Sequence, residues 1–292
     1  MKAGILASGY LGLVCIKDLY HDHDLVFICT DKNSTEIIKY ANTNNIPIFI
    51  GNPRNGNVSG FIYDKVIDIL ISVNYLYLIE NDLIRLPLKM AFNIHGALLP
   101  KYRGRAPHIW AIINNENVTG ISAHLITAEC DSGDIIEQVT IPIGPDDTGY
   151  NLIEKFARRY PLLIKKIISK IKRGTVKPVR QDITKISFFG KRVPEDGLIN
   201  WSWQKERLYN WVRALSAPYP GAFTYYNKTK IIIHASRLSD LGYIYDMENG
   251  LILKVGKNSL FVKTTNGVIE LYKIENFKAH SFKSGKILSN EC

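Results

Sequence analysis

The sequence predicts an α/β protein: an open, mostly parallel sheet with helices on both faces, followed by a smaller β-rich domain. Short apolar runs alternate with helical patterns through the first half of the chain, and this alternation is typical of parallel strands covered on both faces. After about residue 185 the pattern changes to closely spaced short apolar runs. Such runs favour antiparallel strands, so the second part is expected to be mostly β.

The N-terminal elements follow the order that such a sheet requires. A buried strand over residues 2–8 leads into a turn at 9–12 and a helix that begins at 13–19. A helix is expected at 34–44, and the segment 65–73 ends in a strand. Further strands are predicted at 24–30, 46–50, 119–126 and 133–142. The basic segment 151–173 reads as a helix interrupted by Pro161 and closed by Gly174.

The C-terminal elements are a helix over residues 206–215 and then short strands. The strands are expected at 222–226, 231–235, 251–255, 260–264 and 268–272. Asn266-Gly267 is a hairpin signal between the last two. We place the domain boundary after residue 188, giving a domain at 1–188 and a β-rich domain at 189–292.

Composition limits the partners. The chain has 292 residues and a formal net charge of +10, which favours an anionic partner such as nucleic acid, a membrane surface or a phosphorylated small molecule, or else a merely basic surface. No apolar run reaches the roughly 18 residues that span a bilayer.

Four unclustered cysteines, at positions 15, 29, 130 and 292, indicate free thiols and a cytoplasmic location. His21, Asp22 and His23 have no further ligands nearby in the sequence, so no metal site is expected.

Three polar residues carry the chemistry we expect. Asn93 and His95 share one face of a strand, just before a loop rich in proline and glycine, and Asp131 lies in the turn ECDSGD. Transfer of an acyl group to an amine requires a base and a stabiliser of the developing oxyanion. Taken singly, His95 is an ordinary core histidine and Asp131 an ordinary turn residue. Spacing alone does not bring Asp131 beside His95.

The string FNIHGALLPKYRGRAPHIWAIINNENVTGISAHLITAECDSGDIIEQ resembles the signature of the formyltetrahydrofolate-dependent transformylases. RVPEDGLINW and VRALSAPYPGAF are similar to the junction and the start of the small domain in this family. Within it, the chain resembles the sugar N-formyltransferases, including the formyltransferase domain of the bacterial aminoarabinose lipid-modification enzyme. The resemblance implies a Rossmann-like domain followed by an OB-like one.

The resemblance also implies the reaction and its residues. The catalytic trio would be Asn93, His95 and Asp131, with N10-formyltetrahydrofolate as co-substrate and no metal. In the resulting hypothesis, His95 and Asn93 stabilise the oxyanion, while Asp131 keeps His95 protonated or helps to move the proton. Folate contacts, mostly through backbone groups, would come from Tyr77, Leu78, Ile79, Arg105, Thr127, Ala128, Glu129, Cys130 and Asp131. The acceptor would be a dTDP- or UDP-linked amino sugar used for lipopolysaccharide or O-antigen, and the protein a homodimer.

Candidate substrate contacts each have a second interpretation. Ser8, Gly9 and Tyr10 begin a helix that could receive a phosphate or form a plain turn; a nicotinamide site is disfavoured because G-x-G-x-x-G is absent. Arg192 could bind phosphate or form a salt bridge. Trp201 could stack on a nucleobase or pack between domains. Tyr102, together with Trp110 and His124, resembles the sugar-specific subgroup.

Methionyl-tRNA formyltransferase is the main alternative, and a non-catalytic folate or nucleotide binder is the third. The tRNA enzymes of this family carry a longer basic insertion after the second strand, whereas residues 30–34 here offer only Lys32. RNA binding requires many phosphate contacts, so a nucleic-acid partner is disfavoured. The basic stretch at 155–173 could still attract RNA, or could be the solvated face of a helix.

Overall fold

The computed structural model describes residues 1–291; Cys292 lies outside them. Seven strands form the N-terminal sheet in the order β3-β2-β1-β4-β5-β7-β8, which confirms the predicted class. The pairs β1–β2, β1–β4, β2–β3 and β4–β5 are parallel, and β5–β7 is antiparallel. The strands are β1 (Lys2–Ala7), β2 (Asp24–Thr30), β3 (Ile48–Ile50), β4 (Ile69–Val73), β5 (Met90–His95), β7 (Val118–Leu125) and β8 (Ile135–Pro142).

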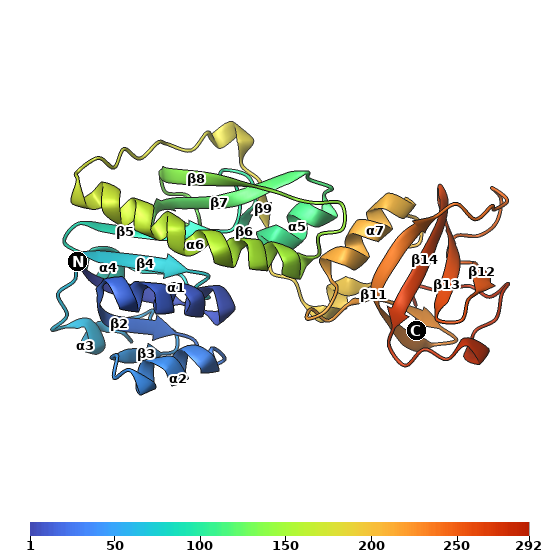
Figure 1. Cartoon of the computed structure of the whole chain (residues 1–292), viewed down its shortest axis with the longest axis horizontal. Coiled ribbons are helices and arrows are strands. Elements are labelled where there is room, and N and C mark those ends of the chain that lie inside the picture. Colours follow the sequence, from blue (N-terminus) through green and yellow to red (C-terminus); the bar gives the residue numbers. More distant parts are fainter. Residues whose placement is uncertain (292) are drawn as a thin grey trace. The chain divides into compact units, whose positions relative to one another are not determined.

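Helices cover both faces of this sheet. The helices of this part of the chain are α1 (Gly9–Asp22), α2 (Thr35–Thr43), α3 (Ser59–Ile62), α4 (Asn81–Ile84), α5 (Pro107–Ile113) and α6 (Gly149–Lys172). Ile5 of β1 and Ile71 of β4 share a core with α1, α2 and α6, while Leu6 and Leu70 share the opposite core with α3 and α4. Figure 1 shows α1 and α6 lying across the strands. Alternate residues of the central strands are therefore buried on opposite sides, as parallel sheets require.

Two predicted helix limits are wrong. α1 begins at Gly9 rather than Leu13, and Gly12 lies inside it, packed so closely on Ala7 that a Cβ would lie 2.9 Å from the Ala7 Cβ. α6 continues through Pro161. A proline inside a helix costs about 3 kcal/mol, but Phe156, Tyr160 and Ile164 on the apolar face of α6 are fully buried against the sheet, and this burial offsets the cost.

The C-terminal part contains α7 (Lys205–Ala214) and a five-stranded antiparallel sheet in the order β10-β11-β14-β13-β12. All five predicted strands are present. The last hairpin turns at Thr265-Asn266, one residue before the predicted pair, because Gly267 already pairs with Thr264. The strands are β10 (Ala222–Tyr226), β11 (Thr229–Ser239), β12 (Ile252–Val255), β13 (Ser259–Thr264) and β14 (Gly267–Ile274).

Residue contacts divide the chain into two compact units. The first contains Met1–Pro107, Thr119–Pro142 and Ile153–Phe189, and the second contains His108–Val118, Ile143–Leu152 and the chain from Gly190 onward. The domain boundary after residue 188 stays a prediction. A short parallel pair, β6 (Arg103–Gly104) and β9 (Phe188–Phe189), lies within the first unit. No helix within residues 1–291 has both the length and the apolar character to cross a membrane.

Candidate active site

The site is built where three neighbouring strands meet. Asn93 on β5 lies directly opposite Ser72 on β4 and His124 on β7. Cross-strand partners of this kind point to the same face of a sheet, and His95, two residues on, shares the face of Asn93. The sheet order, which the local sequence did not reveal, therefore adds His124 to the polar group.

Asp131 reaches this group from the loop between β7 and β8. Its Oδ1 lies 3.5 Å from His95 Nδ1 and 3.6 Å from His124 Nε2, and its Oδ2 accepts the Gly104 N–H at 2.9 Å. Burial by itself raises the pKa of Asp131, but His95, His124 and the Gly104 N–H outweigh it and hold that pKa well below its ordinary value. Asp131 is therefore an ionised, nearly buried carboxylate beside an imidazole.

His95 is a neutral base in this arrangement. Its Nε2 lies 2.7 Å from the carbonyl oxygen of Tyr102, so Nε2 carries the hydrogen and donates it, which leaves the Nδ1 lone pair facing Asp131. Burial lowers the pKa of His95, while Asp131 and the Tyr102 carbonyl raise it by less. Loss of hydration therefore opposes the protonation of His95 that Asp131 was expected to favour.

Asn93 and His124 form a second pair. The Nδ1 of His124 donates to the carbonyl of Leu125 at 2.8 Å, so its Nε2 is the acceptor for Asn93 Nδ2 at 3.0 Å. This contact fixes the Asn93 amide with its nitrogen toward the imidazole. The sequence singled out His124 only through its resemblance to the sugar subgroup, and its proximity to Asp131 depends on the pairing of β5 with β7.

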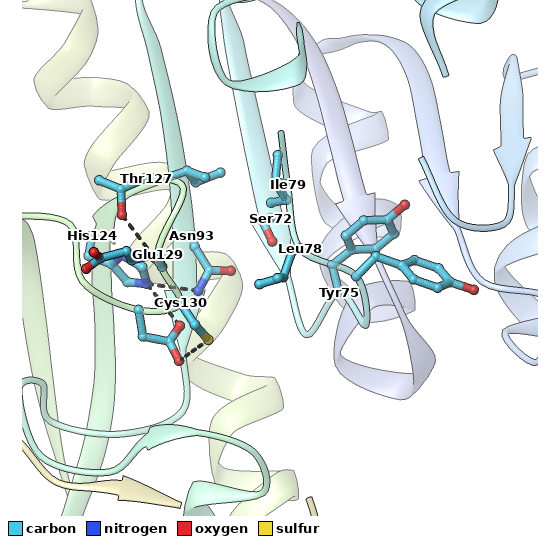
Figure 2. Close-up of a pocket in the computed structure, with 12 residues that line it drawn as sticks. Ser72, Tyr75, Leu78, Ile79, Asn93, His124, Thr127, Glu129 and Cys130 are labelled. Carbon is cyan, nitrogen blue, oxygen red and sulfur yellow. Dashed lines mark hydrogen bonds and ion pairs between the residues drawn. The ribbon is translucent and has the colours of Figure 1, made fainter. Parts of the chain in front are cut away.

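An open pocket of about 90 Å³ adjoins these groups. In Figure 2, Asn93, His124 and Cys130 lie on one side of it and Leu78 and Ile79 on the other. Of the residues expected to contact folate, seven line it: Tyr77, Leu78, Ile79, Thr127, Glu129, Cys130 and Asp131. Ser72, Tyr75, His124 and Ile126 also line it and were not assigned to the site from sequence.

The other two expected folate residues lie close by. Ala128 lines an adjoining cavity that shares Leu78 and Ile79 with the pocket. Arg105 donates from Nη2 to the carbonyl of Leu76, which ties it to the segment that includes Tyr77. Burial, followed by Asp131, raises the pKa of Cys130 to about 12, and its thiol donates to Asp131 Oδ2 at 3.3 Å. Cys130 is therefore an inert thiol at neutral pH.

The start of α1 is linked to a buried aspartate through Ser34. Ser34 accepts the Gly9 N–H at 3.0 Å and donates its hydroxyl hydrogen to Asp31 Oδ2 at 2.6 Å. Asp31 is 3% exposed. Burial alone raises its pKa, but hydrogen bonds from Ser34 and from the Asn33 N–H lower it below the ordinary value. The Ser8–Gly9–Tyr10 turn therefore lies near a buried internal carboxylate, and a phosphate contact at this turn stays a prediction.

The remaining expected substrate contacts have packing partners. The Tyr102 ring stacks on Phe189, with centroids 5.0 Å apart, and the Tyr102 carbonyl holds His95. The guanidinium of Arg192 lies between the indole rings of Trp110 and Trp211, at 4.8 Å and 4.6 Å from their centroids.

Trp201 is 4% exposed and donates to Thr224 Oγ1 at 3.0 Å, with Gly250 close to its ring. Such burial leaves no free ring face, so base stacking by Trp201 is corrected to packing within the C-terminal part.

Three lysines of the basic helix α6 are paired with acids. Lys165 contacts Asp18 and Asp22 of α1, each at 2.9 Å. Lys166 and Lys170 contact Glu137 of β8, at 3.2 Å and 2.5 Å. Their side chains are 42%, 55% and 28% exposed, so these ion pairs add little stability. They do, however, neutralise three of the charges that RNA would need.

Comparison with known families agrees with this geometry. The model of the formyl transferase family matches residues 14–167, and that of the formyl transferase C-terminal domain matches residues 191–286. This chain belongs to the formyl transferase family. The formyl transferase fold thus accounts for both the N-terminal sheet and the β-rich part. Among residues 1–291, no group of three or more His, Cys, Asp or Glu side chains converges as metal ligands would.

Individual formyl transferases and related proteins are similar over most of the chain. The bifunctional polymyxin resistance protein ArnA of Wigglesworthia glossinidia brevipalpis is 34% identical over 244 residues, which cover 80% of this chain and 37% of that protein. The chain thus spans little more than a third of that relative's length.

Two solved structures match with a TM-score of 0.75 and 22% identity. One is WlaRD, a sugar 3N-formyl transferase, covering 95% of this chain and 99% of its own. The other is the N-formyltransferase of Helicobacter canadensis, covering 94% and 99%.

Proposed function

We propose that this formyl transferase moves a formyl group from N10-formyltetrahydrofolate to the primary amine of a nucleotide-linked amino sugar. The observation that carries the proposal is the convergence of Asn93, His95 and Asp131 beside an open pocket. Asp131 is separated from His95 by 36 positions along the chain. Their contact therefore depends on the whole sheet.

The contacts suggest how each residue acts. The amine attacks the formyl carbon, its surplus proton passes to the neutral His95 Nδ1, and the Asp131 carboxylate stabilises the resulting imidazolium. Asn93 donates its amide hydrogen to the developing oxyanion. The C–N10 bond then breaks, and N10 takes up the proton. His95 acts here as the base and not as an oxyanion donor, because its hydrogen is committed to the Tyr102 carbonyl.

The pocket suits the folate end of the reaction. Its walls come from the 75–79 and 126–131 segments, and it mixes apolar side chains such as Leu78 and Ile79 with the polar edge around Asn93. A flat, partly apolar heterocycle with hydrogen-bonding edges fits such a lining. WlaRD was crystallised with 5-N-formyl-THF and dTDP, and the Helicobacter enzyme with folinic acid and dTDP-3-aminofucose.

Two observations favour a sugar over methionyl-tRNA. The connection between β2 and α2 is only residues 31–34, and its Asp31 and Ser34 are buried and hydrogen-bonded to each other. The loop therefore offers no basic insertion for RNA phosphates. Lys165, Lys166 and Lys170 of α6 face acids instead. A nucleotide diphosphate still gains from the net charge of +10.

The finer parts of the proposal rest on the resemblance. The nucleotide is dTDP or UDP, and the product serves lipopolysaccharide or O-antigen biosynthesis. The enzyme works in the cytoplasm as a homodimer, without a membrane or nucleic-acid partner. Tyr102, Arg192 and the Ser8–Gly9–Tyr10 turn contact the sugar nucleotide in this proposal.

A direct assay tests the proposal. The protein is incubated with N10-formyltetrahydrofolate and a panel of dTDP- and UDP-linked amino sugars, with charged initiator tRNA in parallel, and products are analysed by mass spectrometry. One formyl group on a sugar amine is expected, and its loss in His95→Asn. His21→Asn, at an exposed histidine on α1, is the matched control. Formylation of the tRNA alone, or of neither acceptor, would refute the proposal.

A further inference from the structure

Gln181 is a buried polar residue outside the regular elements and outside the catalytic trio. It lies between α6 and β9 and is only 5% exposed. Its Nε2 donates to the carbonyls of Asp131, at 2.9 Å, and Gly133, at 2.7 Å. Its Oε1 accepts from the Arg103 guanidinium, from Nη2 at 2.7 Å and from Nε at 3.2 Å. Both ends of the amide are fully used, so its orientation is fixed.

These bonds join the two segments that hold the Asp131 carboxylate. Arg103 precedes Gly104, whose N–H donates to Asp131 Oδ2. Gln181 therefore links the backbone of Asp131 to Arg103. Arg103 is the chain neighbour of Gly104, which donates to the Asp131 carboxylate. Arg103 itself is anchored, because its N–H donates to the Ser187 carbonyl at 2.9 Å. The result is a closed ring of contacts around one carboxylate.

The Asp131 backbone needs such support. Its φ of +52° is in the left-handed region, which costs a non-glycine residue about 1 kcal/mol and persists when surrounding contacts enforce it. Gly133, two residues on, has no room for a side chain, since a Cβ there would lie 1.9 Å from the Leu125 carbonyl oxygen. Gln181 bonds to both carbonyls and so fixes the turn that presents Asp131 to His95.

We propose that Gln181 is a positioning residue for formyl transfer: its amide holds the Asp131 turn so that the carboxylate faces His95 Nδ1. The inference rests on the proposed function, because the geometry it protects is that of the catalytic trio. A glutamate at this position would retain the contact with Arg103 but could not donate to either carbonyl. Gln181→Glu therefore removes only the bonds to the two carbonyls, whereas Gln181→Leu removes these bonds and the contact with Arg103.

A matched control exists in the same compact unit. Gln138 is more exposed than Gln181, and its Nε2 donates to the Leu99 carbonyl at 2.9 Å and to Ser122 Oγ at 2.7 Å. Gln138→Leu removes as many donated bonds without touching Asp131. The melting temperatures of both variants are measured beside their kinetics, so that loss of stability is separated from loss of positioning.

Steady-state kinetics give the first readout. Gln181→Leu and Gln181→Glu are each expected to lower kcat about 10- to 100-fold, since small displacements of catalytic groups have effects of that order. KM for both substrates should change less than about twofold, because the two hydrogen bonds that Gln181 donates end at backbone carbonyls and not at a substrate. Wild-type kcat in both variants, or an equal loss in Gln138→Leu, would overturn the proposal.

Titration of His95 gives a readout that does not need turnover. The charged and titratable groups facing His95 are Asp131, His124 and Arg103, and Asp131 raises the His95 pKa. NMR of histidine-labelled protein, with His95→Asn for assignment, should show a lower His95 pKa in Gln181→Leu than in wild type and Gln138→Leu. An unchanged titration would reject the role of Gln181. Absence of formyl transfer by wild type would count against the proposed function alone, and the titration would still decide on Gln181.

Discussion

Gly104 donates its backbone N–H to Asp131 Oδ2 across 2.9 Å, while the other oxygen of that carboxylate faces His95 Nδ1 at 3.5 Å. The two oxygens thus have separate partners. One is fixed by the backbone, and the other is directed at the imidazole. A carboxylate held in this way can stabilise a transient imidazolium without moving, which is the kind of preorganisation that catalysis by charge requires.

Asp131→Asn should remove the negative charge of this side chain and keep its shape. The kcat of formyl transfer is expected to fall about 100-fold or more, within the usual range for loss of acid–base assistance. Since Asp131 raises the pKa of His95 and burial lowers it, the variant's His95 pKa falls further. The acid limb of the pH–rate profile therefore moves to lower pH, where His95 now remains neutral. Asp64→Asn, at an exposed aspartate paired with Lys65, should change neither quantity.

Gly104→Ala should uncouple the backbone donor from Asp131. Gly104 has a φ of +96°, and a Cβ there would lie 2.3 Å from the Phe189 carbonyl oxygen. The strand pair β6–β9 must therefore open, and kcat should fall at least about tenfold. Gly190→Ala is the control, because no atom lies within 4 Å of its Cβ position. Equal kinetics for the two variants would contradict this role of Gly104.

Arg192→Leu should destabilise the C-terminal part. The guanidinium lies against two indole rings and donates to the Asp196 carbonyl at 2.9 Å. Cation–π contacts contribute about 0.5–2 kcal/mol each, so a loss of about 1–3 kcal/mol in the free energy of unfolding is expected. Arg207→Leu, where the guanidinium lies over Trp203 alone, should cost less. Denaturant unfolding of both variants makes the comparison.

Trp201→Phe should affect stability and leave substrate binding unchanged. The variant keeps a buried ring but loses the hydrogen bond to Thr224, at a cost of about 1 kcal/mol. Because the indole is buried, KM for the sugar nucleotide should stay at the wild-type value. A rise in KM of tenfold without loss of stability would restore base stacking as its role.

Much of the fold followed from periodicity in the sequence. Strands such as Asp24–Thr30 and Ala222–Tyr226 agree with their predicted limits because turn residues bound continuous apolar runs. The start of α1 was missed because Gly9 and Gly12 resemble a turn, although Gly12 is required for close packing on Ala7. Pro161 suggested a break in the helix for a similar reason. Local helix propensity does not include the burial of α6 against the sheet.

The site was only partly predictable. The motif identified Asn93, His95 and Asp131, but their mutual distances depend on strand order. His124 joins them through the β5–β7 register. Its importance therefore could not follow from the polar pattern alone. The lowered pKa of His95 could not be predicted, since burial of the ring is a property of the folded chain.

The contacts of Gln181 determine where the chain can be cut without disturbing the catalytic residues. The match to the N-terminal formyl transferase model ends at residue 167, yet Gln181 and Ser187 hold Arg103 and the Asp131 turn from beyond that point. A fragment cut at the family limit would retain every residue of the trio and lose what aligns them. Chimeras that exchange the C-terminal part among these enzymes should therefore be joined after Phe189, so that each catalytic sheet keeps its own trailing segment.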